Sequence, residues 1–281
     1  MESTFSNYHK KKEYLLCVDS DGCAMDTMGF KHIRCFGPCM VRQWHLEPWK
    51  QKILERWNQI NLYTRTRGVN RFQGLSIALQ EINQQYCEIA DLDLLNQWVE
   101  TTTELSNDSL QEAIDRNPGA VSLKKALAWS NMVNEMITEL PEQVKKPFRN
   151  VEKALAFARQ YADVAVVSSA NRGAVMEEWQ RCGLLAHTDL VLAQDSGSKT
   201  ACIEKLLSYG YDPQKTVMCG DAMGDLHAAE ENGVYYYPIL AGKEAESWEE
   251  LKEQGMARLL DGSFGQGYQQ KKRQQFLDNF K

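Results

Sequence analysis

Three observations predict that the chain is an α/β protein with a doubly wound, mainly parallel sheet and an all-helical insertion after the first strand. From Pro147 onward, short apolar runs of strand length alternate with helix-length segments. An isolated apolar run, Tyr14–Val18, needs partners for both of its faces. Residues 27–146 carry helical patterns and no convincing strand. We therefore expect a core of residues 1–26 and 147–281, and a helical domain of residues 27–146.

The composition excludes several classes of protein. Of the 281 residues, 43% are hydrophobic and 25% are charged, as in ordinary globular proteins. The formal net charge of -6 argues against a general nucleic-acid binder, which normally carries a basic face. No apolar stretch approaches the length of a membrane span, and the first residues lack the apolar core of a signal peptide. The eight cysteines are scattered without CxxC pairs, so we expect reduced thiols in a cytoplasmic protein.

The first predicted strand ends in two acidic residues. The run Tyr14–Val18 has the length and composition of a buried strand. Asp19 and Asp21 follow it, and Gly22 permits a tight turn. Two carboxylates this close repel each other unless a cation or a shared proton intervenes. We therefore expect Mg²⁺ at this turn, because hard divalent cations prefer carboxylate oxygens. An acidic turn that ends an ordinary strand is the alternative on this segment alone.

The inserted segment is expected to form successive helices. Asp91 and Ser122 are candidate N-caps, and Asn117-Pro118-Gly119 interrupts the helical pattern. Five of the seven tryptophans lie in this segment, where they are expected to fill a small core or cover an interface. The expected helices are Pro48–Tyr63, Arg71–Tyr86, Asp91–Thr102, Ser109–Arg116 and Ser122–Thr138.

The rest of the chain alternates regularly between helix and strand. Because one strand cannot bury both of its faces alone, Tyr14–Val18 must join this later sheet from across the insertion. The expected strands are Asp163–Val167, Asp189–Ala193, Thr216–Cys219 and Val234–Tyr237. The expected helices are Pro147–Tyr161, Asn171–Cys182, Thr200–Tyr209, Asp225–Glu231, Glu244–Glu253 and Gln266–Asn279.

Polar residues follow the carboxyl ends of several predicted strands. A parallel sheet brings these ends to one edge, so the side chains can converge there. Together they would supply carboxylates for a metal, a nucleophile, a hydroxyl donor and a cation, which is the set that phosphoryl transfer needs. The residues are Asp19, Asp21, Ser168, Asp221 and Asp225, with Lys199 just before a helix.

These residues lie in motifs that resemble those of the haloacid dehalogenase-like hydrolase superfamily. Asp19-Ser20-Asp21-Gly22, residues 164–168, Lys199 and residues 220–225 match its four motifs in order. Each motif alone is a weak signal, but four in order with strand and helix context are strong. The resemblance implies a Rossmann-like core, and the helical insertion resembles the superfamily's first type of cap domain.

The resemblance implies a role for each matching residue. Asp19 would attack phosphorus and form an aspartyl-phosphate. Asp21 would protonate the leaving oxygen and then activate water. Ser168 would donate a hydrogen bond to the phosphoryl oxygens, and Lys199 would neutralise negative charge beside Asp19.

A metal site and neighbouring substrate contacts are also implied. Ser169 and Asn171, next to Ser168, are assigned to substrate binding, with Ser169 the weaker candidate for the hydroxyl role. The residues implied to hold Mg²⁺ are Asp19, Asp21 through its main-chain carbonyl, Asp221 and Asp225.

Asp21 discriminates among the activities of the superfamily. Dehalogenases have no acid at that place, because a halide leaves without protonation, so Asp21 favours phosphatase or phosphomutase chemistry. Cys23, Ala222 and Thr200 depart from the commonest motif residues, but no chemical group that the mechanism needs is lost. Lys205 competes with Lys199, although its place inside a predicted helix favours an exposed position.

The cap residues are expected to select the substrate. The stretch 65–71 resembles the cap loop of the branch that contains β-phosphoglucomutase and phosphoglycolate phosphatase. Arg67 and Arg71 suit a second anionic group of the substrate, or form solvated helix ends. His32 resembles a histidine that follows the first motif in many capped members, and either contacts substrate or belongs to the hinge or core.

The leading functional hypothesis is a Mg²⁺-dependent phosphomonoesterase that acts on a small phosphorylated metabolite. A sugar phosphomutase that uses the same aspartyl-phosphate is the alternative, and a phosphonate hydrolase is less favoured. A non-catalytic binding protein on the same fold is the third class. Neither a nucleic acid nor a membrane is expected as a partner, and either a monomer or a homodimer is compatible with the sequence.

Overall fold

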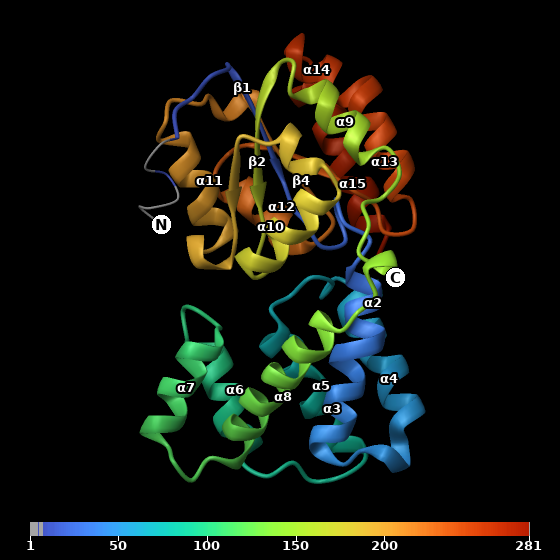
Figure 1. Ribbon diagram of the computed structural model, residues 1–281, viewed down its shortest axis with the longest axis vertical. Helices are drawn as coiled ribbons and strands as arrows, with labels where there is room; N and C mark the ends of the chain where they lie inside the picture. Colours follow the sequence, from blue (N-terminus) through green and yellow to red (C-terminus); the bar gives the residue numbers. More distant parts are fainter. Residues whose placement is uncertain (1–4, 6–7, 281) are drawn as a thin grey trace. The chain divides into compact units, whose positions relative to one another are not determined.

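The chain divides into two compact units, seen in the computed structural model of Figure 1, which describes Phe5 and residues 8–280. The core unit comprises the described residues up to Met28 and those from Glu142 onward. The helical unit comprises Gly29–Pro141. The sequence predicts that the chain leaves the core unit for the helical unit after residue 26 and returns to the core unit after residue 146.

The core unit contains a five-stranded sheet in the order β3-β2-β1-β4-β5, with every pair parallel. Strand β1 lies in the centre, and Val18 at its end pairs with Val166 on one side and Cys219 on the other. The prediction that the first strand joins the later sheet is therefore confirmed. The strands are β1 (Tyr14–Val18), β2 (Ala162–Val167), β3 (Leu190–Leu192), β4 (Thr216–Gly220) and β5 (Tyr235–Pro238).

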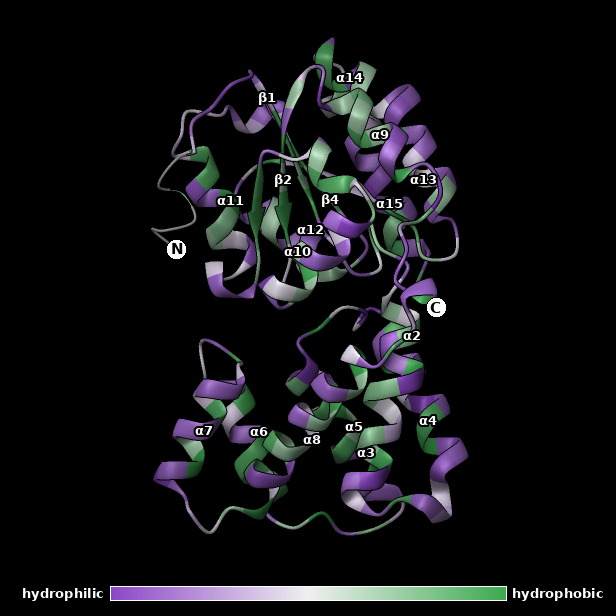
Figure 2. Ribbon diagram, in the orientation of Figure 1, coloured by the Kyte–Doolittle hydropathy of each residue, from purple (hydrophilic) through white to green (hydrophobic). Residues whose placement is uncertain are grey.

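Helices cover both faces of this sheet. Leu16 and Val18 pack in one hydrophobic cluster with α9, α10, α13 and α14, whereas Leu15 and Cys17 pack in another with α11, α12 and α15. Alternate residues of a strand point to opposite faces, so β1 is buried on both. Figure 2 shows the apolar strands between helices that turn polar residues outward. The core helices are α9 (Val151–Ala158), α10 (Arg172–Arg181), α11 (Lys199–Leu207), α12 (Met223–Glu231), α13 (Glu244–Glu250), α14 (Met256–Leu260) and α15 (Gln269–Asp278).

The doubly wound, Rossmann-like fold class predicted from the sequence is thus confirmed, with differences at element ends. The predicted helix from Pro147 begins only at Val151, because Pro147 pairs with Met25 and the Phe148 N–H donates to the carbonyl of Ala24. Within the part of the chain that the structure describes, no helix is both long and apolar enough to cross a bilayer. All eight cysteines are free thiols.

The helical unit packs around buried aromatic rings. Trp57 and Trp129 are fully buried, their ring centroids lie 6.1 Å apart, and the Trp129 indole N–H donates to the carbonyl of Phe36 at 3.1 Å. The expected tryptophan core of this segment is present. Its helices are α3 (Gly37–Trp44), α4 (Lys50–Asn58), α5 (Arg71–Gln85), α6 (Leu92–Thr101), α7 (Asn107–Arg116) and α8 (Val121–Thr138).

A helical stretch that the sequence did not predict precedes α4. Helix α2 (Met28–Lys31) continues through a π-helical turn, His32–Phe36, into α3. The sequence did not indicate a helix here, because Gly37 and Pro38 both have low helix propensity. In the structure Pro38 lies in the first turn of α3, where its missing N–H costs little. Gly37 permits close packing, because a Cβ there would lie 2.8 Å from Leu54.

Of the two predicted N-caps of this unit, Asp91 occupies the N-cap position of α6 without a side-chain cap, whereas Ser122 was wrong. Asp91 has a left-handed backbone (φ 53°) and makes no side-chain cap to α6; its Oδ2 accepts from the Val121 N–H at 2.9 Å instead. Ser122 lies within the first turn of α8, and its hydroxyl donates to the carbonyl of Asp91 at 2.6 Å. Both residues therefore join the start of α8 to the start of α6.

Candidate active site

Three aspartates converge at the carboxyl edge of the sheet. Asp19 follows β1, Asp221 follows β4, and Asp225 lies in the first turn of α12. One carboxylate oxygen from each lies within 4.8 Å of the others. All three are buried, with exposed fractions of 5%, 1% and 0%. The sequence-based expectation that these strand ends bring acidic residues together is therefore confirmed for this triad.

Gly220 makes room for this cluster. A Cβ at position 220 would lie 2.2 Å from Cγ of Asp225, so no larger residue fits without displacing that carboxyl. The Asp225 Oδ2 accepts from the Ala222 N–H at 3.0 Å, which fixes the side chain across the end of β4. The glycine at the end of the strand is thus required by the close approach of Asp225.

Lys199 lies between two of the aspartates. Its Nζ is 2.9 Å from Asp19 Oδ1 and 2.5 Å from Asp225 Oδ1, and only 14% of its side chain is exposed. Burial alone would lower the pKa of Lys199, but the carboxylates of Asp19 and Asp225 outweigh it and raise this pKa. The side chain is therefore a fixed positive charge beside the proposed nucleophile.

One ammonium does not neutralise three carboxylates. Burial raises the pKa of Asp19 to about 7, with Lys199 opposing the rise and Asp225 adding to it. Burial also raises the pKa of Asp225, opposed by Lys199 and assisted by Asp221. An all-oxygen donor set with excess negative charge is the environment that a hard divalent cation requires. The residues present therefore fit the expected Mg²⁺.

Asp21 lies on the turn after β1 and is held by a residue that the sequence analysis missed. The Thr27 hydroxyl donates to Asp21 Oδ1 at 2.6 Å, and Thr27 is 2% exposed. Gly22 has a φ of 82°, as the predicted tight turn requires. Thr27 was missed because nothing in a single sequence indicates that a hydroxyl six residues later returns to the aspartate.

Ser168 lies at the same edge, directly after β2, which pairs with β1. It is 4% exposed, and its Oγ accepts from the Ala170 N–H at 3.1 Å. Ser169 and Asn171 are exposed, and Asn171 Oδ1 accepts from the Ala174 N–H to cap α10. Ser168 thus has the buried position expected of the hydroxyl donor, while substrate contacts by Ser169 and Asn171 stay predictions.

The three candidate residues of the cap have contacts within the helical unit. His32 stacks on Phe36 with ring centroids 4.6 Å apart. Arg67 is 6% exposed and donates to the Leu62 carbonyl at 2.9 Å. Arg71 donates to Asn134 Oδ1 at 2.7 Å and lies over the ring of Phe36. These contacts give each residue a structural role, and a substrate contact remains a prediction.

A model of the haloacid dehalogenase-like hydrolase family matches residues 88–238, just over half of the chain. The chain belongs to this family. It is therefore an enzyme of the hydrolase class, and the resemblance identified in its motifs is confirmed. No curated protein matches the sequence.

Solved structures similar to this chain include a HAD hydrolase of family IA, variant 3, from Entamoeba histolytica. It has 14% identity and a TM-score of 0.52, and the match covers 89% of this chain and 99% of that one. A protein assigned as a phosphoglycolate phosphatase from Lactobacillus delbrueckii subsp. bulgaricus has 14% identity and a TM-score of 0.49, with 81% and 86% covered. One assigned as a β-phosphoglucomutase from Thermotoga maritima has 16% identity and a TM-score of 0.47, with 86% and 99% covered. The first of these supports the fold.

Proposed function

We propose that the protein is a Mg²⁺-dependent phosphomonoesterase that hydrolyses a small phosphorylated metabolite through an aspartyl-phosphate on Asp19. The observation that supports this most is the buried group of Asp19, Lys199 and Asp225 beside Asp221. It places a carboxylate nucleophile next to a fixed ammonium and within an acidic cluster whose negative charge exceeds its positive charge. Phosphoryl transfer depends on positioning and on neutralising charge, and this group supplies both.

In the first half-reaction, a carboxylate oxygen of Asp19 attacks phosphorus and the bond to the ester oxygen breaks. Asp21 gives its proton to the leaving alkoxide. Lys199 and Ser168 hold the phosphoryl oxygens by charge and by hydrogen bonding. The product of this step is a free alcohol and a phosphorylated Asp19.

In the second half-reaction, Asp21 takes a proton from water, and the water oxygen attacks phosphorus. The acyl phosphate bond then breaks and returns Asp19 as a carboxylate. Asp19, Asp221, Asp225 and the main-chain carbonyl of Asp21 would hold Mg²⁺, which supplies positive charge to the phosphoryl oxygens. With that cation present, Asp19 is ionised at neutral pH despite the rise in its pKa caused by burial.

Substrate choice is proposed to come from the cap, with Arg67, Arg71 and His32 as candidates for contact with the part of the metabolite that is not transferred. A planar guanidinium suits a second phosphate or a carboxylate. The cytoplasm is the proposed location, in keeping with eight free thiols.

The experiment that tests this proposal is release of inorganic phosphate from a panel of phosphorylated metabolites and an aryl phosphate. We expect turnover that requires Mg²⁺, stops with a chelator, and falls at least about 10⁴-fold in Asp19→Asn. Asp163→Asn is the matched control, since Asp163 is an equally buried aspartate of β2 outside the acidic triad. The folded fraction of this control should keep wild-type activity.

The other outcomes separate the competing functions. Isomerisation of a sugar phosphate that depends on a bisphosphate primer, with little free phosphate, would favour the phosphomutase. Mg²⁺ binding without turnover of any phosphoester would favour the binding protein.

A further inference from the structure

Two buried indole groups bind the turn that carries Asp19 and Asp21. The backbone of this turn, residues 19–25, closes on itself, since the Ser20 carbonyl accepts from the N–H groups of Ala24 (2.9 Å) and Met25 (2.8 Å). The indole N–H of Trp179 donates to the Ser20 hydroxyl at 2.9 Å. The indole N–H of Trp248 donates to a backbone carbonyl of the turn.

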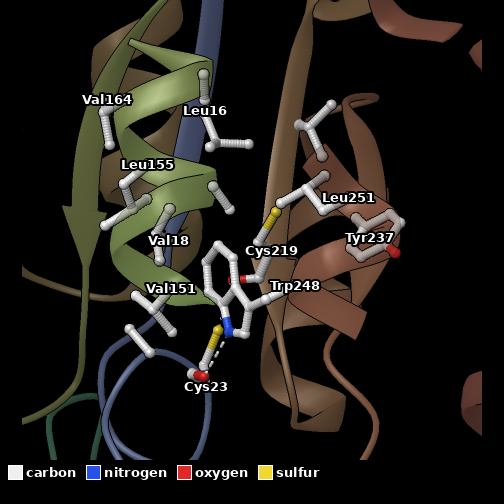
Figure 3. Close-up of a cluster of buried hydrophobic side chains, with 14 of the residues drawn as sticks. Leu16, Val18, Cys23, Val151, Leu155, Val164, Cys219, Tyr237, Trp248 and Leu251 are labelled. Atoms are coloured by element: carbon white, nitrogen blue, oxygen red, sulfur yellow. Dashed lines mark hydrogen bonds between the residues drawn. The ribbon is translucent and has the colours of Figure 1, made fainter. Parts of the chain in front are cut away.

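Trp248 binds the carbonyl of Cys23. The distance from its Nε1 to that oxygen is 2.9 Å, and both residues are fully buried. Figure 3 shows the indole directed from α13 toward Cys23, with Val18 and Cys219 beside it. The carbonyl therefore has no access to bulk water, and a buried carbonyl that loses its donor must find another partner or move.

The helix that carries Trp248 is itself fixed to the sheet. The Tyr237 hydroxyl on β5 donates to the Ser247 carbonyl at 2.9 Å. The buried Lys272 of α15 pairs with Glu250 at 2.5 Å, and its Nζ lies 5.2 Å from the centre of the Tyr237 ring. These contacts hold α13 on both sides of Trp248, so the indole N–H is presented from a rigid support.

Helix α13 and Lys272 of α15 lie outside the part of the chain that matches the family model, which ends at residue 238. The turn with Asp19 and Asp21 also lies outside it. Helix α13 thus does more than cover one face of the sheet, because it supplies a hydrogen bond to the turn that carries the proposed nucleophile.

We propose that Trp248 is a positioning residue for Asp19 and Asp21, an inference that rests on the proposed phosphomonoesterase function. Its indole N–H fixes the Cys23 carbonyl, and with it the backbone of residues 19–25. The carbonyl of Asp21, assigned to the metal, and its carboxyl, assigned to proton transfer, lie only two residues before Cys23. Loss of the N–H would let this turn shift while the rest of the sheet keeps its packing.

Two changes at position 248 test this role. Trp248→Phe removes the donor and part of the ring, whereas replacement of Trp248 by benzothienylalanine removes the donor and keeps the ring size. Trp129→Phe is the matched control, because it also removes a buried indole N–H that donates to a backbone carbonyl, that of Phe36 at 3.1 Å, but in the helical unit and not in the turn. If Trp248→Phe does not fold, the isosteric replacement decides.

Amide hydrogen exchange at residues 23–25 is the first measurement, because it requires neither substrate nor Mg²⁺. We expect exchange there to rise about tenfold in both position-248 variants and to stay at the wild-type rate in Trp129→Phe. With Mg²⁺ and the best substrate of the panel, kcat should fall about tenfold and KM should change less than about twofold.

Equal exchange at residues 23–25 in the position-248 variants and in Trp129→Phe would overturn the inference, as would an unchanged kcat. A wild-type protein that releases no phosphate from any substrate would overturn the proposed function instead. In that case the exchange rates still decide whether Trp248 fixes the turn.

Discussion

The core unit holds two clusters of buried aspartates at opposite ends of its strands, and their surroundings differ. Asp163 and Asp189 lie at the amino end, at the start of β2 and just before β3. Asp163 Oδ2 accepts from the N–H groups of Lys11 and Lys12 and from the Tyr211 hydroxyl. Asp19, Asp221 and Asp225 lie at the carboxyl end with Lys199 as their ammonium partner.

The pKa values of Asp189 and Asp19 are shifted in opposite directions. Burial would raise the pKa of Asp189, but the Val164 N–H and the Lys11 ammonium outweigh burial and lower it. Burial raises the pKa of Asp19 to about 7, because the Lys199 ammonium does not offset the combined effect of burial and of the neighbouring Asp225 carboxylate. Asp189 is thus compensated by the chain itself, through the Val164 N–H and the Lys11 ammonium, whereas the carboxyl-end cluster leaves negative charge for a cation. That difference distinguishes a structural acidic cluster from a candidate active site.

Removing the ammonium from the carboxyl-end cluster should have the largest effect. Lys199→Met should lower phosphate release about 10³-fold, because Asp19 and the phosphoryl group lose their fixed positive charge. Steady-state kinetics with Mg²⁺ measures this loss. Lys215→Met is the control, since Lys215 forms an exposed ion pair with Glu13 and should not affect turnover. Similar kinetics in the two variants would remove Lys199 from the mechanism.

Filling the space beside Asp225 should come next. Gly220→Ala places a Cβ against that carboxyl, so we expect weaker Mg²⁺ binding and a loss of about 2 kcal/mol in the free energy of unfolding. Gly224→Ala is the matched control, because a Cβ there meets nothing within 4 Å. Denaturant unfolding and Mg²⁺ titration measure both effects. Gly220→Ala with wild-type Mg²⁺ affinity would show that Asp225 does not need this position.

Thr27 should have a smaller effect that is confined to Asp21. Thr27→Val keeps the shape and removes the hydroxyl that donates to Asp21, so kcat should fall about tenfold with little change in KM. Thr27→Ser keeps the hydroxyl and should recover most of the activity. An equal loss of kcat in Thr27→Val and Thr27→Ser would show that packing, and not the hydroxyl, causes the effect.

The smallest expected effect is the pH dependence of stability in the metal-free protein. The folded pKa of Asp19 is above its ordinary value, so the folded state binds its proton more tightly than the unfolded state. This contribution is fully present below the unfolded pKa, about 4, and is lost as the pH rises through about 7. The melting temperature of the wild type should therefore fall by a few degrees between pH 5 and pH 8 relative to Asp19→Asn, and Mg²⁺ should remove the difference. A parallel pH dependence in the two proteins would contradict the raised pKa.

Asp189 should show the opposite sign. Its folded pKa is lowered, so its contribution is present above its unfolded pKa and is lost as the pH falls through the folded value. Asp189→Asn should therefore cost most stability near neutral pH and least in acid, which the same melting experiments measure.

The carboxyl-end cluster could be predicted from the sequence because Asp19 and Asp221 directly follow short apolar strands and Asp225 lies one helical turn beyond Asp221. Topology alone brings such strand ends together, as Asp19 after β1 and Asp221 after β4 illustrate. The amino-end cluster could not be predicted, since the partners of Asp163 come from distant segments, including Tyr211. The roles of Thr27 and Trp248 could not be predicted either, because their contacts with the turn depend on tertiary packing.

Local pattern also failed where close packing overrides helix propensity. The helical stretch through Gly37 was missed because Gly and Pro interrupt the pattern, although Gly37 is what allows that helix to approach Leu54. Asp91 and Ser122 have the composition of N-caps, yet they bind each other's segments instead of their own helices. Element type followed from periodicity, whereas caps and exact ends depended on tertiary contacts.

The central claim is that the carboxyl-end cluster needs a cation and the amino-end cluster does not. Calorimetric titration of the metal-free protein with Mg²⁺ tests it most directly, using wild type, Asp221→Asn and Asp163→Asn. We expect saturable binding in the wild type and in Asp163→Asn, and loss of that binding in Asp221→Asn. Wild-type protein that binds no Mg²⁺, or equal binding by all three proteins, would contradict the account.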